Sequence, residues 1–261
     1  MKNNLLFALF WGALIGILGG LMGLGGAEFR LPVLTFFFHF TTLHAVIINL
    51  LVSLVTVASS LTFRWESLDA VFPYLPIVIT LLSGSLIGAF IGAGIASRID
   101  EKRLDRLVAL LLGVIAVIIV SESFIHFNPL DLGTIIQTII GFISGIVIGL
   151  FSSMLGVAGG ELIIPTIMLL YGIDIKLAGT LSLMVSLPTI IVGLYRYRNK
   201  EPFRIVMPNV KFIAFMAIGS IGGSWIGKSL LGIVSSEGLK IFLALILVVS
   251  AIKLYQKSKT P

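Results

Sequence analysis

The chain has 261 residues, of which 57% are hydrophobic and 11% are charged, and it carries a net charge of +6 with no cysteine. Soluble domains carry about 25% charged residues, so this composition excludes a water-soluble fold. The positive charge falls in short segments between apolar runs, as in membrane proteins, and predicts no nucleic-acid partner. The absence of cysteine excludes disulfides and thiolate ligands.

The apolar runs are long enough to predict membrane-spanning helices. A helix that crosses the bilayer needs about 20 apolar residues. Runs of about this length occur at 5–24, 45–63, 71–97, 104–121, 133–155, 178–195, 209–230 and 238–255. Two shorter runs, at 29–40 and 162–173, reach only part of the way through a bilayer. The sequence therefore predicts an all-α polytopic membrane protein with eight spanning helices and two short half-helices.

Two glycine-rich segments, 23–32 and 156–165, repeat each other within this apolar sequence. Each has clustered glycines, then a glutamate and, four residues later, a proline, and each residue has its partner 133 positions further on. Helix-breaking glycines at matching positions of two halves indicate a transporter's binding site. Because further matches flank both segments, we predict a first membrane repeat at 1–125, a linker at 126–132 and a second membrane repeat at 133–261.

The distribution of Lys and Arg bears on how the repeats are oriented. If the two short runs cross the membrane, the second repeat is inverted and the basic residues divide thirteen to four between the two sides. If the short runs do not cross, the repeats are parallel and the division is ten to seven. The positive-inside rule favours the uneven division, and thus an inverted repeat with both termini in the cytoplasm. A re-entrant arrangement with eight spanning helices remains an alternative.

Both breaks end in a proline, Pro32 in the first and Pro165 in the second, and the second is soon followed by Asp-Ile-Lys-Leu-Ala-Gly-Thr-Leu-Ser at 174–182. With these features, and over essentially its whole length, the chain resembles the sulfite exporter TauE/SafE family. The resemblance implies a multi-pass inner-membrane protein that moves small sulfur-containing anions such as sulfite or sulfonates. The chain departs from a triple glycine at Ala27 and Ala158, and alanine is less free to adopt left-handed conformations.

The candidate substrate site combines the two breaks with the polar residues that follow them. A helix start offers free backbone N–H groups and the positive end of a dipole, which bind an anion without a cationic side chain. Two such starts that face each other near the middle of the membrane would form one pocket. The predicted substrate-binding residues are Gly23, Gly25, Gly26, Glu28, Arg30, Asn49, Ser53, Gly156, Gly159, Gly160, Glu161, Ser182 and Ser186.

Several of these residues also have a purely structural interpretation. Glu28 and Glu161 either cap the first turn of a helix or are protonatable groups that couple anion movement to protons. Arg30 either binds the anion, pairs with one of these glutamates or extends toward the membrane surface. The asparagine and serines of the set either line the pocket or form hydrogen bonds between helices. Glycines spaced four residues apart, such as Gly12 and Gly16, are expected to allow close helix packing.

These patterns predict a secondary transporter of small anions that works by alternating access at the interface between the repeats. An anion channel, or a transporter of an unrelated small solute, remains an alternative. The sequence has no Walker A motif and no histidine in a full-length apolar run, so we expect no enzyme activity, no cofactor and no metal. The expected partners are a small anion, protons as a coupling ion and membrane lipid, while the oligomeric state stays open.

Overall fold

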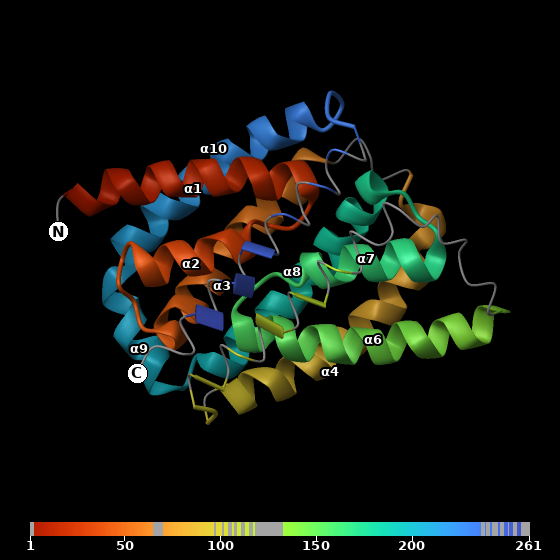
Figure 1. The fold of residues 1–261 in the computed structure, drawn as a ribbon, viewed down its shortest axis with the longest axis horizontal. Coiled ribbons are helices and arrows are strands. Elements are labelled where there is room, and N and C mark those ends of the chain that lie inside the picture. The colour runs from red at the N-terminus through yellow and green to blue at the C-terminus, as the bar shows by residue number, and fades with distance from the viewer. Residues whose placement is uncertain are drawn as a thin grey trace.

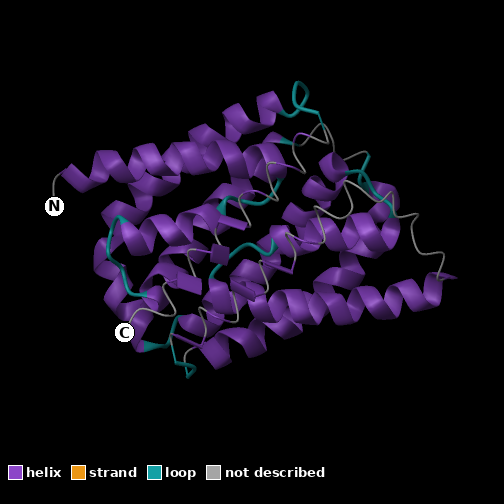
Figure 2. Cartoon of the chain, in the orientation of Figure 1, coloured by secondary structure: helices purple, strands orange, loops and turns teal. Residues whose placement is uncertain are grey.

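The computed structural model describes residues 3–64, 70–96, 98–100 and 133–235, and scattered residues between 102 and 117 and between 238 and 256. Figure 2 shows helices joined by turns and loops, and no strand occurs among the described residues. The predicted all-α fold is therefore confirmed for this part of the chain. The predicted linker at 126–132 lies outside the described residues, as do most of the predicted runs at 104–121 and 238–255.

The described helices follow the predicted apolar runs in chain order. They are α1 (Asn3–Met22), α2 (Ala27–Phe36), α3 (Thr42–Phe63), α4 (Leu75–Ala96), α6 (Gly133–Leu155), α7 (Gly160–Tyr171), α8 (Ile175–Tyr197), α9 (Glu201–Val206) and α10 (Val210–Leu230), with 3-10 turns at Phe72–Tyr74 and Met207–Asn209. Six segments in the described part are long and apolar enough to cross a membrane, and they coincide with six of the eight predicted runs. Helices α2 and α7 have only 10 and 12 residues. At 1.5 Å per residue, neither spans a hydrocarbon core about 30 Å thick by itself. Helix α2 nevertheless runs from the first break back toward the end of the molecule where α1 begins (Figure 1), so the chain leaves α2 on the side where a crossing run would leave it.

Two tightly packed helix pairs form opposite sides of the molecule, and α3 and α8 pack against each other between them. One pair is α1 with α10, and the other is α4 with α6 (Figure 1). Each pair therefore joins a helix of the predicted first repeat to a helix of the predicted second repeat. Figure 1 also shows that α1 and α6, which are equivalent in the sequence match, run in opposite directions along the long axis.

Glycine stripes explain why these pairs pack so closely. A Cβ atom built on Gly16 would collide with the backbone of Ser220 in α10, and one built on Gly88 would collide with the backbone of Ile146 in α6. The other glycines of the four-residue stripes meet their partner helix in the same way. The predicted packing role of these glycines is confirmed, because only a residue without a side chain permits this approach.

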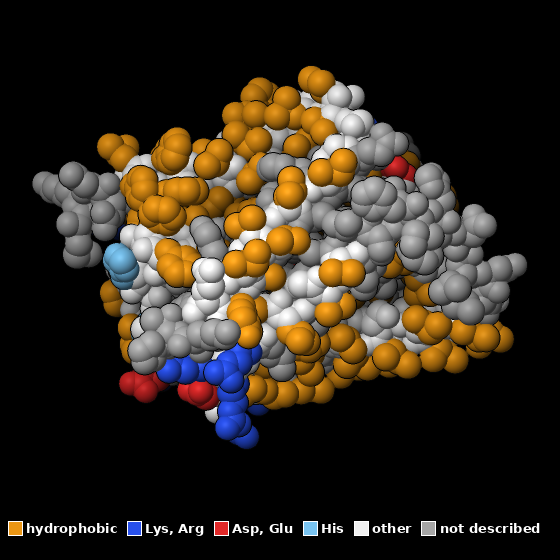
Figure 3. All heavy atoms as spheres, viewed as in Figure 1, with side chains coloured by type: hydrophobic (Ala, Val, Ile, Leu, Met, Phe, Trp, Pro, Cys, Tyr) orange, Lys and Arg blue, Asp and Glu red, His pale blue; other side chains and the backbone are white. Residues whose placement is uncertain are grey.

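The outer faces of the pairs are apolar. On α6, the side chains of Ile135, Ile139 and Ile143 are more than half exposed. Figure 3 shows hydrophobic side chains over much of the visible face, and a group of Lys and Arg side chains at the end of the molecule where α9 lies. A wide apolar belt with charges at one end is the surface expected of a protein surrounded by lipid.

Candidate functional site

The two breaks are built by glycines with left-handed backbone conformations. Their φ angles are 77° at Gly23, 80° at Gly25 and 71° at Gly26 in the first break, and 67° at Gly156 and 82° at Gly159 in the second. Residues with a side chain rarely adopt positive φ, so glycine ends α1 and restarts the chain as α2. Ala158, which matches Gly25, has no positive φ, and the two breaks therefore differ in backbone geometry at this point. Ala27 and Gly160 are already helical, where alanine is not at a disadvantage.

The two breaks lie against each other in the interior. A Cβ atom on Gly25 would lie 3.3 Å from the Cβ of Ala158, and one on Gly160 would lie 2.9 Å from the Cα of Leu24. Helices α2 and α7 extend from this junction toward opposite ends of the molecule (Figure 1). The structure thus brings together the two helix starts that the sequence analysis placed in one site.

Each break also packs against the long central helix of the other half. Gly23 approaches the backbone of Gly179 in α8 so closely that no side chain fits between them. Gly156 makes the equivalent approach to Val46 in α3. The junction therefore lies at the interface between the two predicted repeats, with both halves contributing to each side of it.

Arg30 is the only predicted site residue with a cationic side chain, and its side chain is completely buried. Its guanidinium makes five hydrogen bonds, which cross from α2 to the first break and to helices α3 and α10. Nη1 donates to Asn49 Oδ1 (3.1 Å) and Ser53 Oγ (2.8 Å), and Nη2 donates to the Gly25 carbonyl (3.4 Å), Thr56 Oγ1 (3.3 Å) and Ser220 Oγ (3.3 Å). Each of these acceptors is a neutral oxygen, and the buried Nε has no hydrogen-bond partner among the residues that the structure describes.

No carboxylate forms an ion pair with Arg30 in the described part of the chain. The carboxylates of Glu28 and Glu161 are buried, and neither accepts a hydrogen bond from a described residue. The predicted alternatives of a salt bridge and of an extension to the membrane surface are therefore wrong for Arg30. A buried guanidinium without a paired counter-ion can bind an anion.

The position that matches Arg30 in the second half is not an arginine. Ile163 matches Arg30, while Thr189 and Ser85 match Thr56 and Ser220. Around Ile163 these two hydroxyls, one from each predicted repeat, form a hydrogen bond directly with each other, 2.7 Å apart. Around Arg30 the guanidinium bonds to both corresponding hydroxyls instead. The site therefore has polar side chains on both sides and a cation on only one.

The remaining polar residues of the predicted set differ in whether their side chains have a hydrogen-bond partner. The amide nitrogen of Asn49 donates to the Ala27 carbonyl at 2.7 Å, and the hydroxyl of Ser182 donates to the Gly23 carbonyl at 2.6 Å. These two equivalent residues attach the central helices α3 and α8 to the first break, so hydrogen bonding between segments accounts for both. The hydroxyl of Ser186 is buried without a partner.

Arg64 is a buried functional candidate that was not among the predicted site residues, because a cation directly after an apolar run resembles a loop residue. The structure buries this side chain at the end of α3, where Nη1 donates to Thr180 Oγ1 at 3.0 Å and Nη2 donates to the Gly20 carbonyl at 2.7 Å. The residue that matches it in the second half, Tyr197, donates its hydroxyl to the Ser153 carbonyl at 3.0 Å. Both side chains thus satisfy carbonyls at the end of a broken helix, where no backbone donor is available.

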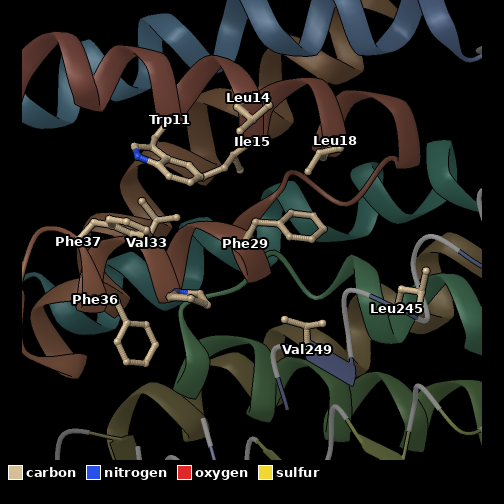
Figure 4. Close-up of a pocket in the computed structure, with 11 residues that line it drawn as sticks. Trp11, Leu14, Ile15, Leu18, Phe29, Val33, Phe36, Phe37, Leu245 and Val249 are labelled. Atoms are coloured by element: carbon tan, nitrogen blue, oxygen red, sulfur yellow. The ribbon is translucent and has the colours of Figure 1, made fainter. Parts of the chain in front are cut away.

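A cavity of about 370 Å³ lies beside the first break, between α1, α2 and residues Leu245 and Val249 (Figure 4). Its lining is almost entirely apolar, and its one polar side chain is Trp11. The cavity has no cation and no helix start, so it does not suit an anion. Among the described residues, no group of three or more histidine or acidic side chains is placed to hold a metal ion.

Comparisons with known proteins agree with this architecture. The profile of the family described as Sulfite exporter TauE/SafE matches residues 8–254. A probable membrane transporter protein of Methanocaldococcus jannaschii is 28% identical over 253 residues, which is 90% of both chains. A probable membrane transporter protein of Bacillus subtilis is 26% identical over 239 residues, which is 87% of this chain and 90% of the relative. No solved structure matches significantly. The chain therefore belongs to the sulfite exporter TauE/SafE family of membrane transporters.

Proposed function

We propose that the protein is a secondary transporter of small sulfur-containing anions, such as sulfite or a sulfonate, with its substrate site at the junction of the two breaks. The observation that carries the proposal is the buried guanidinium of Arg30, whose hydrogen bonds all go to neutral groups. Burial of an unpaired charge costs several kcal/mol, so its presence calls for a function. An anion at the junction would supply the missing negative charge and would also meet the starts of α2 and α7.

The two glutamates support coupling to protons. Glu28 and Glu161 lie in the first turns of α2 and α7, buried and without hydrogen-bond partners. An ionised carboxylate repels an anion, whereas a protonated one does not. Anion binding and proton binding at this site therefore favour each other, and each must change the affinity for the other by the same factor.

The arrangement of the halves supports alternating access. The breaks meet at the interface between the predicted repeats, and α1 and α6 run in opposite directions, as an inverted repeat requires. Rocking of one half against the other around the fixed junction would expose the site to each side in turn. With the Lys and Arg count of the loops, this proposal places both termini in the cytoplasm and the protein in the inner membrane.

Flux measurements in proteoliposomes test the proposal. Uptake of radiolabelled sulfite, sulfate, thiosulfate and a sulfonate is measured with and without a pH gradient, for the wild type, Glu28→Gln and Glu161→Gln. We expect saturable flux of one anion that a pH gradient drives uphill, and we expect the glutamine variants to lose the uphill component. Ser229→Ala is the control, because Ser229 is not among the predicted site residues and its exposed hydroxyl donates only to the Trp225 carbonyl within α10.

Three other outcomes contradict parts of this proposal. Flux that never saturates and never exceeds equilibrium indicates a channel, because a channel cannot concentrate its ion. A saturable flux with the same response to pH in the wild type and in both glutamine variants would indicate that the glutamates have only a structural role. If none of the four anions is transported, the proposal that the substrate is a small sulfur-containing anion is wrong.

A further inference from the structure

A second cavity that contains arginines lies where α4 and α8 end. It has a volume of about 260 Å³, and it shares no residue with the candidate substrate site. Its lining residues are Phe90, Ile91, Gly94, Ile95, Arg98 and Arg196. The lining thus contains two cations and no acidic side chain, and the remaining residues are apolar or glycine.

The guanidinium of Arg196 has a hydrogen-bond donor without a described partner. Its guanidinium carbon lies 4.5 Å from the centre of the Phe90 ring, in a cation–π arrangement that fixes the plane of the group. Its Nε is buried and has no hydrogen-bond partner among the described residues. A guanidinium whose buried Nε–H has no described partner is suited to an oxyanion such as phosphate.

The other lining residues identify the rest of the ligand. Phe90 and Ile91 are 46% and 44% exposed and belong to the apolar outer face of α4, which lipid covers in a membrane. The cavity therefore joins a cationic end to a hydrocarbon surface within one site. A ligand that satisfies both parts carries an oxyanion on a long apolar chain, which is the chemistry of an anionic phospholipid.

We propose that Arg98 and Arg196 bind the phosphate of an anionic phospholipid whose acyl chain lies along Phe90 and Ile91. This site is separate from the proposed transport site and does not depend on it. The bound lipid would attach the ends of α4 and α8 to one leaflet. In the orientation proposed above, with both termini in the cytoplasm, that leaflet is the cytoplasmic one, and the lipid site itself does not depend on this assignment.

Native mass spectrometry of the detergent-solubilised protein tests the site. The protein is titrated with a phosphatidylglycerol, with a phosphatidylcholine that has the same acyl chains, and with inorganic phosphate. The variants are Arg98→Gln and Arg196→Gln. The matched control is Arg198→Gln, because Arg198 stacks on Tyr195 at 4.0 Å in the same way but does not line the cavity.

We expect the wild type to retain one phosphatidylglycerol in preference to phosphatidylcholine. Loss of a charge-assisted hydrogen bond should weaken that binding at least about tenfold in Arg196→Gln, and less in Arg98→Gln. Binding to Arg198→Gln should equal that of the wild type. If Arg198→Gln weakens phosphatidylglycerol binding as much as Arg196→Gln does, the lipid is attracted by positive charge in general, and the proposal is wrong. No preference for the anionic lipid, or displacement of it by inorganic phosphate, would also overturn it. Unchanged unfolding temperatures in detergent verify that each variant is folded.

Discussion

Replacement of Arg30 by methionine separates the role of its charge from the role of its volume. The matched control is Ile163→Met, which makes the same residue at the equivalent position of the second half. Ile163 is 1% exposed, so the control changes shape in an equally buried environment without any change of charge. Volume-conserving apolar exchanges of this kind cost less than about 1.5 kcal/mol.

The hydrogen bonds around Arg30 set the expected change in stability. After its removal, the hydroxyls of Thr56 and Ser220 keep their bonds to the carbonyls of Val52 and Gly12. The principal losses fall on Asn49 Oδ1 and on the hydroxyl of Ser53, and each buried unsatisfied group costs about 1–3 kcal/mol. Release of a buried charge offsets this cost, so we expect the free energy of unfolding to change by less than about 3 kcal/mol.

The effect on anion binding should be much larger than that of the control. A hydrogen bond to a charged group contributes about 1.5–3 kcal/mol, which corresponds to an affinity change of about 10- to 150-fold. We therefore expect the KM for the transported anion to rise by at least tenfold in Arg30→Met and to stay near the wild-type value in Ile163→Met. Saturation curves from proteoliposome flux measure both. An equal effect of the two substitutions, with both variants folded, would refute the assignment of Arg30 to the anion.

Two further predictions concern stability, and chemical unfolding in detergent measures both. Gly88→Ala should lower the free energy of unfolding by about 1–3 kcal/mol, because its Cβ meets the backbone of Ile146, whereas Gly222→Ala, with open space around it, should raise it by up to about 1 kcal/mol. Equal effects would argue against the close packing of α4 on α6. Arg64→Ala should destabilise by about 1–3 kcal/mol, and Arg64→Tyr should recover part of this loss, since Tyr197 supplies the equivalent hydrogen bond in the second half. No difference between alanine and tyrosine would contradict the helix-end role.

The sequence could predict the breaks because a local property causes them. Clustered glycines lower the cost of left-handed backbone, so Gly23 and Gly156 locate the ends of α1 and α6 without any knowledge of packing. The partners of Arg30 could not be predicted in the same way. Three come from the same face of α3, but Ser220 lies 190 residues away in α10, and hydropathy does not encode which long helices become neighbours.

Arg64 shows a second limit of sequence patterns. A cation that directly follows an apolar run resembles a loop residue, and the positive-inside rule counts it as one. Only the fold shows that the last carbonyls of α1 lie next to it and lack donors. The match between Arg64 and Tyr197 was the available signal, because both residues end equivalent apolar runs and both can donate a hydrogen bond.

The pairing of α1 with α10 has a consequence for the order of assembly. The hydroxyl of Ser220 donates to the Gly12 carbonyl across 208 residues of sequence, whereas α4 and α6 are successive among the described helices. Synthesis proceeds from the N-terminus, so α1 enters the bilayer long before its partner exists. Until α10 arrives, the glycine stripe of α1 faces lipid or a temporary neighbour. Among the described helix pairs, α4 with α6 therefore forms early, and α1 with α10 completes the molecule.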